Sequence, residues 1–158
     1  MKGKHLVTIK NNVLRYQFVI RRNITIIKGD SATGKTTLID MVREYFENGE
    51  QSGVSLQCDK TCIVLEGRQW KILLENIHDA IVFIDEGNLF ITTDEFSSAV
   101  KKSDNYNVIV TREGLPNLPY SVDEIYVDRI LPEKMKYNLE YLKTFNIVGD
   151  IILCIKLS

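Results

Sequence analysis

Short apolar runs alternate with amphipathic stretches along most of this chain. Residues 24–28 and 80–84 are short and almost wholly apolar, which predicts strands buried on both faces of a parallel sheet. Residues 107–112 form a similar run with a polar exit, and shorter strands are expected at 61–66 and 124–130. These runs predict a mainly parallel sheet.

Between the predicted strands, apolar residues recur at the spacing of an α-helix. Residues 37–46 place Leu38, Val42 and Tyr45 on one face, with Ile39 and Phe46 beside them, and Asn48-Gly49 supplies a stop. Residues 68–79 repeat the pattern with Trp70, Leu73, Leu74 and Ile77, and we expect Trp70 to be a packing residue. A third helix is expected at 93–102, capped by Thr93 or Asp94. The polar residues 47–60 are expected to be an exposed connection.

The two ends of the chain have a different pattern. Residues 4–10 and 13–20 predict an antiparallel hairpin turning at Asn11-Asn12, with Tyr16 and Phe18 packed on the domain's own core or forming a partner surface. After Pro132, alternation at 135–141 and an apolar run at 151–157 predict two closing strands, and a helix at 133–145 is the alternative.

Composition limits the class of protein. The 158 residues suit a single domain, 1–158, and 44% hydrophobic with 26% charged residues is typical of a globular chain. The net charge of -1 gives no general attraction to nucleic acid or to an anionic membrane. No apolar run approaches the roughly 20 residues of a membrane span, and no signal peptide is evident, so a cytoplasmic location is expected. Cys58 and Cys62 lack the second ligand pair of a zinc site, and with Cys154 we expect them to be thiols.

One motif dominates the chemistry. Gly29-Asp30-Ser31-Ala32-Thr33-Gly34-Lys35-Thr36 follows the first buried strand and fits the phosphate-binding loop G-x-x-x-x-G-K-[ST]. Two glycines let successive N–H groups wrap around a di- or triphosphate, and the following helix, with Thr37 in its first turn, adds its positive dipole end. Lys35 is expected to reach the β- and γ-phosphates, and Thr36 to ligate Mg²⁺.

Polar residues follow two other buried strands. Asp85 and Glu86 end the run at 80–84, where ligands bind in open α/β sheets. We expect Asp85 to hold Mg²⁺ and Glu86 to polarise the attacking water. Thr111 and Arg112 follow a strand expected beside the phosphate loop, from which they can face the γ-phosphate.

G-D-S-A-T-G-K-T followed by I-V-F-I-D-E resembles the Walker A and Walker B motifs of the P-loop ATPases. The adjacent carboxylates and the extra strand ending in Thr111 are similar to the branch that contains ABC and AAA+ ATPases. The resemblance covers residues 24–130 and implies a three-layer P-loop NTPase fold, with Thr111 as the γ-phosphate sensor. No LSGGQ-type motif precedes the Walker B strand, and residues 131–158 are too few for a helical lid. The resemblance is therefore to a reduced ATPase core.

Three functions follow from these residues. The first is an ATPase that uses ATP and Mg²⁺ as a switch or motor domain for a protein partner or in a nucleotide-dependent homo-oligomer, with Arg112 as a candidate arginine finger. The second is a small-molecule or nucleoside kinase, for which Arg112, Arg129 and Lys134 are the only lid candidates. The third is a regulatory module that binds nucleotide without hydrolysing it. No N-K-x-D-like guanine reader is present, so adenine is favoured.

Overall fold

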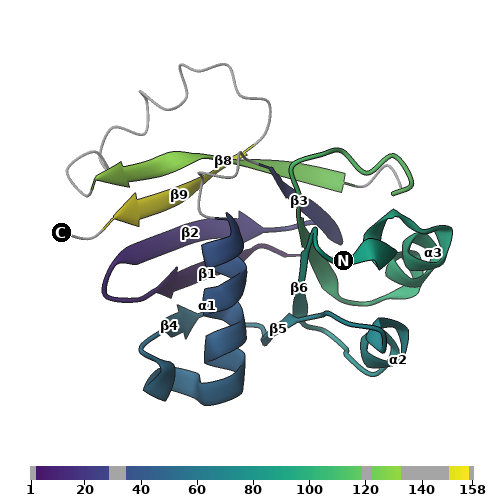
Figure 1. Ribbon diagram of the computed structural model, residues 1–158, viewed down its shortest axis with the longest axis horizontal. Coiled ribbons are helices and arrows are strands. Elements are labelled where there is room, and N and C mark those ends of the chain that lie inside the picture. The colour runs from purple at the N-terminus through teal and green to yellow at the C-terminus, as the bar shows by residue number, and fades with distance from the viewer. Residues whose placement is uncertain (1–2, 29–34, 119–121, 133–149, 157–158) are drawn as a thin grey trace.

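The chain forms a mixed α/β fold in which, among the described elements, three strands precede the first helix and three strands follow the last (Figure 1). The computed structural model describes residues 3–28, 35–118, 122–132 and 150–156, and for 35–36, 122–132 and 150–156 only the backbone is described. The elements are β1 (His5–Lys10), β2 (Leu14–Ile20), β3 (Ile24–Lys28), α1 (Lys35–Asn48), β4 (Ser55–Gln57), β5 (Cys62–Val64), α2 (Trp70–Glu75), β6 (Ile81–Asp85), α3 (Asp94–Lys102), β7 (Tyr106–Val110), β8 (Val122–Pro132) and β9 (Asp150–Lys156), with 3₁₀ turns at Gly49–Ser52 and Leu89–Thr92.

The strands form one mixed sheet in the order β4-β1-β2-β9-β8-β3-β7-β6-β5. β3 pairs in parallel with β7 and β8, β6 with β5 and β7, and β8 with β9. β1 pairs antiparallel with β2 and β4, and β2 pairs antiparallel with β9. The expected α/β class and the N-terminal hairpin are therefore confirmed.

The sheet curls until its two edge strands lie close together. β4 and β5 are the edges, yet only residues 58–61 separate them in the sequence. Across the curl, the rings of Phe18 in β2 and Phe83 in β6 lie 6.3 Å apart. The β1–β2 hairpin thus packs on a core shared with the parallel strands, and Tyr16 is fully buried in it. Tyr16 and Phe18 pack on the domain's own core, the first of the two expected roles.

Helices cover both faces of the parallel strands. α1 packs with Leu38, Ile39 and Val42 on the face that the hairpin shares, and α2 and α3 pack on the other face (Figure 1). In that second core the Trp70 ring stacks on Phe90 at 4.8 Å and meets Phe96 at 5.7 Å, so the expected packing role of Trp70 is confirmed. β6 supplies apolar side chains to both cores, which accounts for its continuous apolar run.

Several expected boundaries were wrong. The connection at 47–60 contains a 3₁₀ turn and β4, which adds to the sheet through backbone pairing with β1. The second helix is only six residues long, and its Leu73 is 45% exposed because so short a helix buries a narrow face, here Trp70 and Leu74. Phe46, expected on the core face of α1, is 53% exposed.

The two closing strands have different outcomes. β9 confirms the strand expected near 151–157. The strand expected at 135–141, and its helical alternative, lie outside the described residues. None of the described helices has the length and apolarity that crossing a membrane requires.

Candidate functional site

The carboxyl ends of β3, β7 and β6 lie side by side at one edge of the sheet. β7 is the middle strand, and its Val110 is in register with Ile27 of β3 and with Asp85 of β6. Just beyond it, the Thr111 N–H donates to the Ile27 carbonyl at 3.0 Å. The segment leading to the phosphate motif, the Asp85-Glu86 pair and Thr111 are therefore neighbours, although Ile27, Asp85 and Thr111 come from three separate parts of the sequence.

Asp85 is the last residue of β6 and is half-buried. Among the described residues, none forms a hydrogen bond or an ion pair with its carboxylate. Its backbone carbonyl accepts hydrogen bonds from the Asn88 N–H at 3.1 Å and from Asn88 Nδ2 at 3.0 Å. The strand end is thus fixed by its backbone, and no described residue engages the carboxylate.

Asn88 is a positioning residue that the sequence analysis missed. Besides its contacts with Asp85, its Oδ1 accepts a hydrogen bond from the Gly67 N–H at 3.3 Å. Gly67 follows β5, so Asn88 links the loops after two neighbouring strands. An Asn three residues after a strand-end Asp is compatible with such a turn, but its link to Gly67 spans 21 residues and leaves no local pattern.

Glu86 contacts Arg112 across the same edge. One carboxylate oxygen accepts the Arg112 backbone N–H at 2.9 Å, and the other lies 3.5 Å from Arg112 Nε. The two side chains are 37% and 60% exposed, so the ion pair contributes at most ~1 kcal/mol. A ligand that competes for either group can therefore separate them at small cost.

Thr111 is buried, and its hydroxyl closes a local turn. Oγ1 accepts the Glu113 N–H at 3.2 Å and donates to the Glu113 carbonyl at 3.2 Å. The expected contact of Thr111 with a γ-phosphate would require the hydroxyl to exchange one of these bonds. The position beside β3 is as expected, and the role in phosphate sensing stays a prediction.

The phosphate motif itself lies mostly outside the described residues. Gly29, Asp30, Ser31, Ala32, Thr33 and Gly34 are not described, and Lys35 and Thr36 are described only as the first backbone residues of α1. Thr37 is half-buried in the same turn. No acidic residue occupies this first turn, so no side chain there offsets the positive end of the helix dipole. The predicted binding roles of these nine residues stay predictions.

A salt-bridge network braces α1 against the loop after β5. Arg43 Nε and Nη2 each lie 3.0 Å from an oxygen of Glu66, and Arg43 Nη1 lies 2.8 Å from Asp40 Oδ1. The hydrogen bond to Glu66 is the main cause of a raised pKa of the Arg43 guanidinium. This fork joins the helix that follows the motif to the strand beside β6.

Two other features bear on ligand binding. A groove of about 660 Å³ opens between α2 and α3 and is lined partly by Leu74, Ile77 and Ala99, toward the amino ends of β6 and β7 and away from the edge just described. Within the described ranges, no three His, Cys, Asp or Glu side chains lie close enough to hold a metal ion. The Mg²⁺ set expected here is of another kind: one Asp, one Thr hydroxyl, phosphate oxygens and water.

Comparisons with known proteins leave the function of this edge open: a scan against protein-family models finds no match, and a search of curated proteins finds no similar sequence. What the site does has to be inferred from the residues at the three strand ends and from the motif before α1.

Proposed function

We propose that this chain is a P-loop ATPase core that binds ATP with Mg²⁺ at the carboxyl ends of β3, β7 and β6 and hydrolyses it. The observation that supports this most is the adjacency of those three strand ends, because it gathers groups of the required chemistry from three distant parts of the sequence. In α/β sheets this edge is where ligands bind.

The residues at this edge of the sheet offer the kinds of group that bind a nucleotide with Mg²⁺. Asp85 offers an oxygen ligand that no described residue engages, and the start of α1 has no acidic side chain to repel a phosphate. In the proposed site the amides of residues 29–34 and Lys35 bind the phosphates, with Thr37 in the same turn, and Thr36 and Asp85 hold the metal. Bound Mg²⁺ would neutralise charge on the β- and γ-phosphate oxygens.

Glu86 and Thr111 supply the remaining proposed roles. Glu86 orients the attacking water as a general base, which requires its carboxylate to leave the Arg112 N–H at least in part. Thr111 lies between the ends of β3 and β6, where its hydroxyl can report the γ-phosphate. Arg112 either stays with Glu86 or turns toward the phosphates of its own chain or a neighbour.

The Glu86–Arg112 contact also supports a second candidate, a regulatory module that binds nucleotide without hydrolysing it. If Arg112 keeps the carboxylate after nucleotide binds, no general base is free, and the chain reports occupancy to a partner. The partner in either case is a protein, or a second copy that assembles when nucleotide binds. Sedimentation with and without Mg²⁺-ATP distinguishes the second copy from a different partner.

Nucleotide titration tests the proposed site directly. Wild type should bind ATP in the presence of Mg²⁺, and Lys35→Ala should lose affinity by ~10- to 100-fold, the value of one charge-assisted hydrogen bond. Lys10→Ala is the matched control because Lys10 is an exposed lysine on the hairpin, and it should bind as wild type does. Equal affinity of Lys35→Ala and wild type, with both folded by circular dichroism, would remove the assignment.

A further inference from the structure

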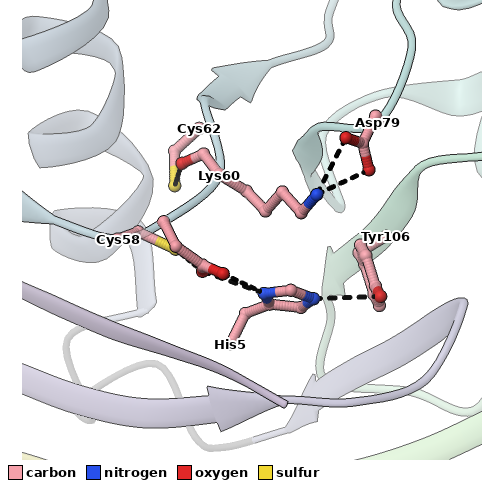
Figure 2. A network of polar contacts seen from close by, with 7 residues as sticks. His5, Cys58, Lys60, Cys62, Asp79 and Tyr106 are labelled. Atoms are coloured by element: carbon pink, nitrogen blue, oxygen red, sulfur yellow. Dashed lines mark hydrogen bonds and ion pairs between the residues drawn. The ribbon is translucent and has the colours of Figure 1, made fainter. Parts of the chain in front are cut away.

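Two cysteines stand at the ends of the turn that joins the sheet's edge strands. Cys58 follows β4 directly and is half-buried, whereas Cys62 opens β5 and is buried in the core that includes α1 (Figure 2). The Cys58 sulfur lies 3.7 Å from Asp59 Oδ1, and the Cys62 sulfur lies 3.8 Å from the Lys60 carbonyl. Each sulfur therefore contacts one of the two residues that begin the turn, Cys58 contacting Asp59 and Cys62 contacting Lys60.

The turn is anchored on both sides. The Asp59 carboxylate binds His5 Nδ1 of β1 at 2.8 and 2.9 Å, and His5 Nε2 lies 3.0 Å from the Tyr106 hydroxyl of β7. Lys60 Nζ lies 2.8 Å from both carboxylate oxygens of Asp79, ahead of β6 (Figure 2). These contacts join the turn to three other parts of the sheet, so they hold its two ends, and with them the cysteines, in place.

The two thiols differ in acidity. Hydrogen bonding from Cys62 is the main cause that lowers the pKa of Cys58 to about 7, against an opposing effect of burial and of the Asp59 charge. The same hydrogen bond and burial raise the pKa of Cys62. Cys58 is also the more exposed of the two sulfurs, so it is the better placed to act as the nucleophile, while burial favours the protonated thiol at Cys62. This asymmetry matches the division between an attacking and a resolving cysteine.

We propose that Cys58 and Cys62 form a redox-active thiol pair that a hydroperoxide oxidises to an intramolecular disulfide. The Cys58 thiolate attacks the terminal peroxide oxygen, the O–O bond breaks, and the alkoxide or hydroxide that leaves takes up a proton. Cys58 is then a sulfenic acid. The Cys62 sulfur attacks Cys58, the S–S bond forms, and the hydroxyl of the sulfenic acid leaves as water with the Cys62 proton. Two thiols are oxidised and one hydroperoxide is reduced to an alcohol or water.

Mass spectrometry of the full chain tests the pair independently of any nucleotide. In a Cys154→Ser background, reduced protein treated with hydrogen peroxide at pH 7 should lose the mass of two hydrogen atoms and give a peptide linking Cys58 to Cys62. In the Cys62→Ser variant, oxidation should stop at a sulfenic acid on Cys58, which dimedone traps. In the Cys58→Ser variant, Cys62 should stay reduced. Oxygen uptake on either cysteine without loss of the two hydrogens would overturn the proposal.

The pH profile of alkylation supplies a second measurement that needs no oxidant. At pH 7 a thiol of pKa about 7 has roughly 16 times the thiolate of an ordinary cysteine near 8.5. A thiolate of lower pKa is also a weaker nucleophile, and this reduces its reaction rate about fivefold. The two effects together predict that Cys58 reacts with iodoacetamide about threefold faster in the native wild-type chain than in the unfolded chain. A midpoint near 8.5 for Cys58 in the native chain would contradict the proposal, even if the serine variants fail to fold.

Discussion

The two ends of the parallel strands use their polar groups differently. At the amino ends of β6 and β7, the buried His5 is bound by Asp59 and Tyr106, and the buried Asn105 side chain binds the Ala80 N–H at 3.0 Å and the Ile77 carbonyl at 2.7 Å. At the carboxyl ends, the Asp85 carboxylate has no partner among the described residues, and Glu86 is held by an exposed arginine.

The difference separates groups that stabilise the fold from groups that are available for chemistry. Leaving a buried polar group unpaired costs about 1–3 kcal/mol, so the pairing of His5 and Asn105 is explained by folding alone. The pairing is not complete, because the buried Asn107 Oδ1 and Thr25 Oγ1 near the same strand ends have no partner among the described residues. Among the described residues, the carboxylates at the other end have an exposed partner, as Glu86 has in Arg112, or none, as for Asp85. Substitutions at the carboxyl ends should therefore change function and leave stability nearly unchanged, and substitutions at the amino ends should do the reverse.

The largest expected effect is on hydrolysis at the carboxyl ends. Glu86→Gln removes the proposed general base and should slow ATP hydrolysis by ~10²–10⁴ while Mg²⁺-ATP still binds. Asp85→Asn should instead weaken the dependence of binding on Mg²⁺. Phosphate release and nucleotide titration measure the two separately. Hydrolysis by Glu86→Gln at the wild-type rate would move the catalytic role elsewhere, and no hydrolysis by wild type would favour the regulatory module.

This contrast also marks what the sequence could predict. The buried strands at 24–28 and 81–85 were found because an apolar run with both faces covered has a local pattern. β4 was missed because Ser55–Gln57 joins the sheet by backbone pairing with β1. Backbone pairing does not require a particular pattern of side chains, so three residues of this kind give no local signal. The second helix was predicted too long because periodicity does not show where Trp70–Glu75 ends.

The candidate site was predictable as a set of residues and not as a set of contacts. The strand-end acids and Thr111 follow apolar runs, so their placement at one edge could be inferred from the strands. The contact of Glu86 with Arg112 joins residues 26 apart, and His5 meets Tyr106 across 101 residues. Such pairings depend on strand order and on the curl of the sheet, which no local pattern encodes.

The amino-end network should control stability. His5→Ala removes one hydrogen-bond partner of the Asp59 carboxylate and one of the Tyr106 hydroxyl, and it should lower the free energy of unfolding by about 2 kcal/mol. Nucleotide affinity should not change. Leu6→Ala is the control on the same strand, because Leu6 is 48% exposed, and it should cost less than about 1 kcal/mol. Urea denaturation measures both; equal losses for the two variants would show that the network contributes nothing.

A smaller effect is expected from the salt-bridge network at the carboxyl ends. Arg43→Ala breaks the fork with Glu66, but the acidic partners are about half exposed, so the loss should stay within ~1 kcal/mol. Because added salt screens exposed charges, the difference from wild type should shrink further at 1 M salt. Denaturation at low and high salt checks this. A loss that is larger and independent of salt would mean that Arg43 stabilises the helix by packing.

The smallest expected effect is a pH dependence confined to the amino-end network. The hydrogen bond from His5 lowers the pKa of Asp59 below its ordinary value of 3.8. A carboxyl whose pKa is lowered in the folded state binds its proton more readily when unfolded, so its contribution to stability is present above pH 3.8 and is lost as pH falls through the folded pKa. Asp59→Asn should therefore be less stable than wild type at neutral pH, and the difference should narrow in acid.

Asp104→Asn is the matched control, because Asp104 pairs with the exposed His78 at 3.2 Å and should contribute little at any pH. Unfolding measured from pH 7 down to the acid limit of the native state decides between them. If the Asp59 and Asp104 curves run parallel to wild type, the His5–Asp59 contact is only a surface pair, and the distinction between the two ends of the strands loses its support at this residue.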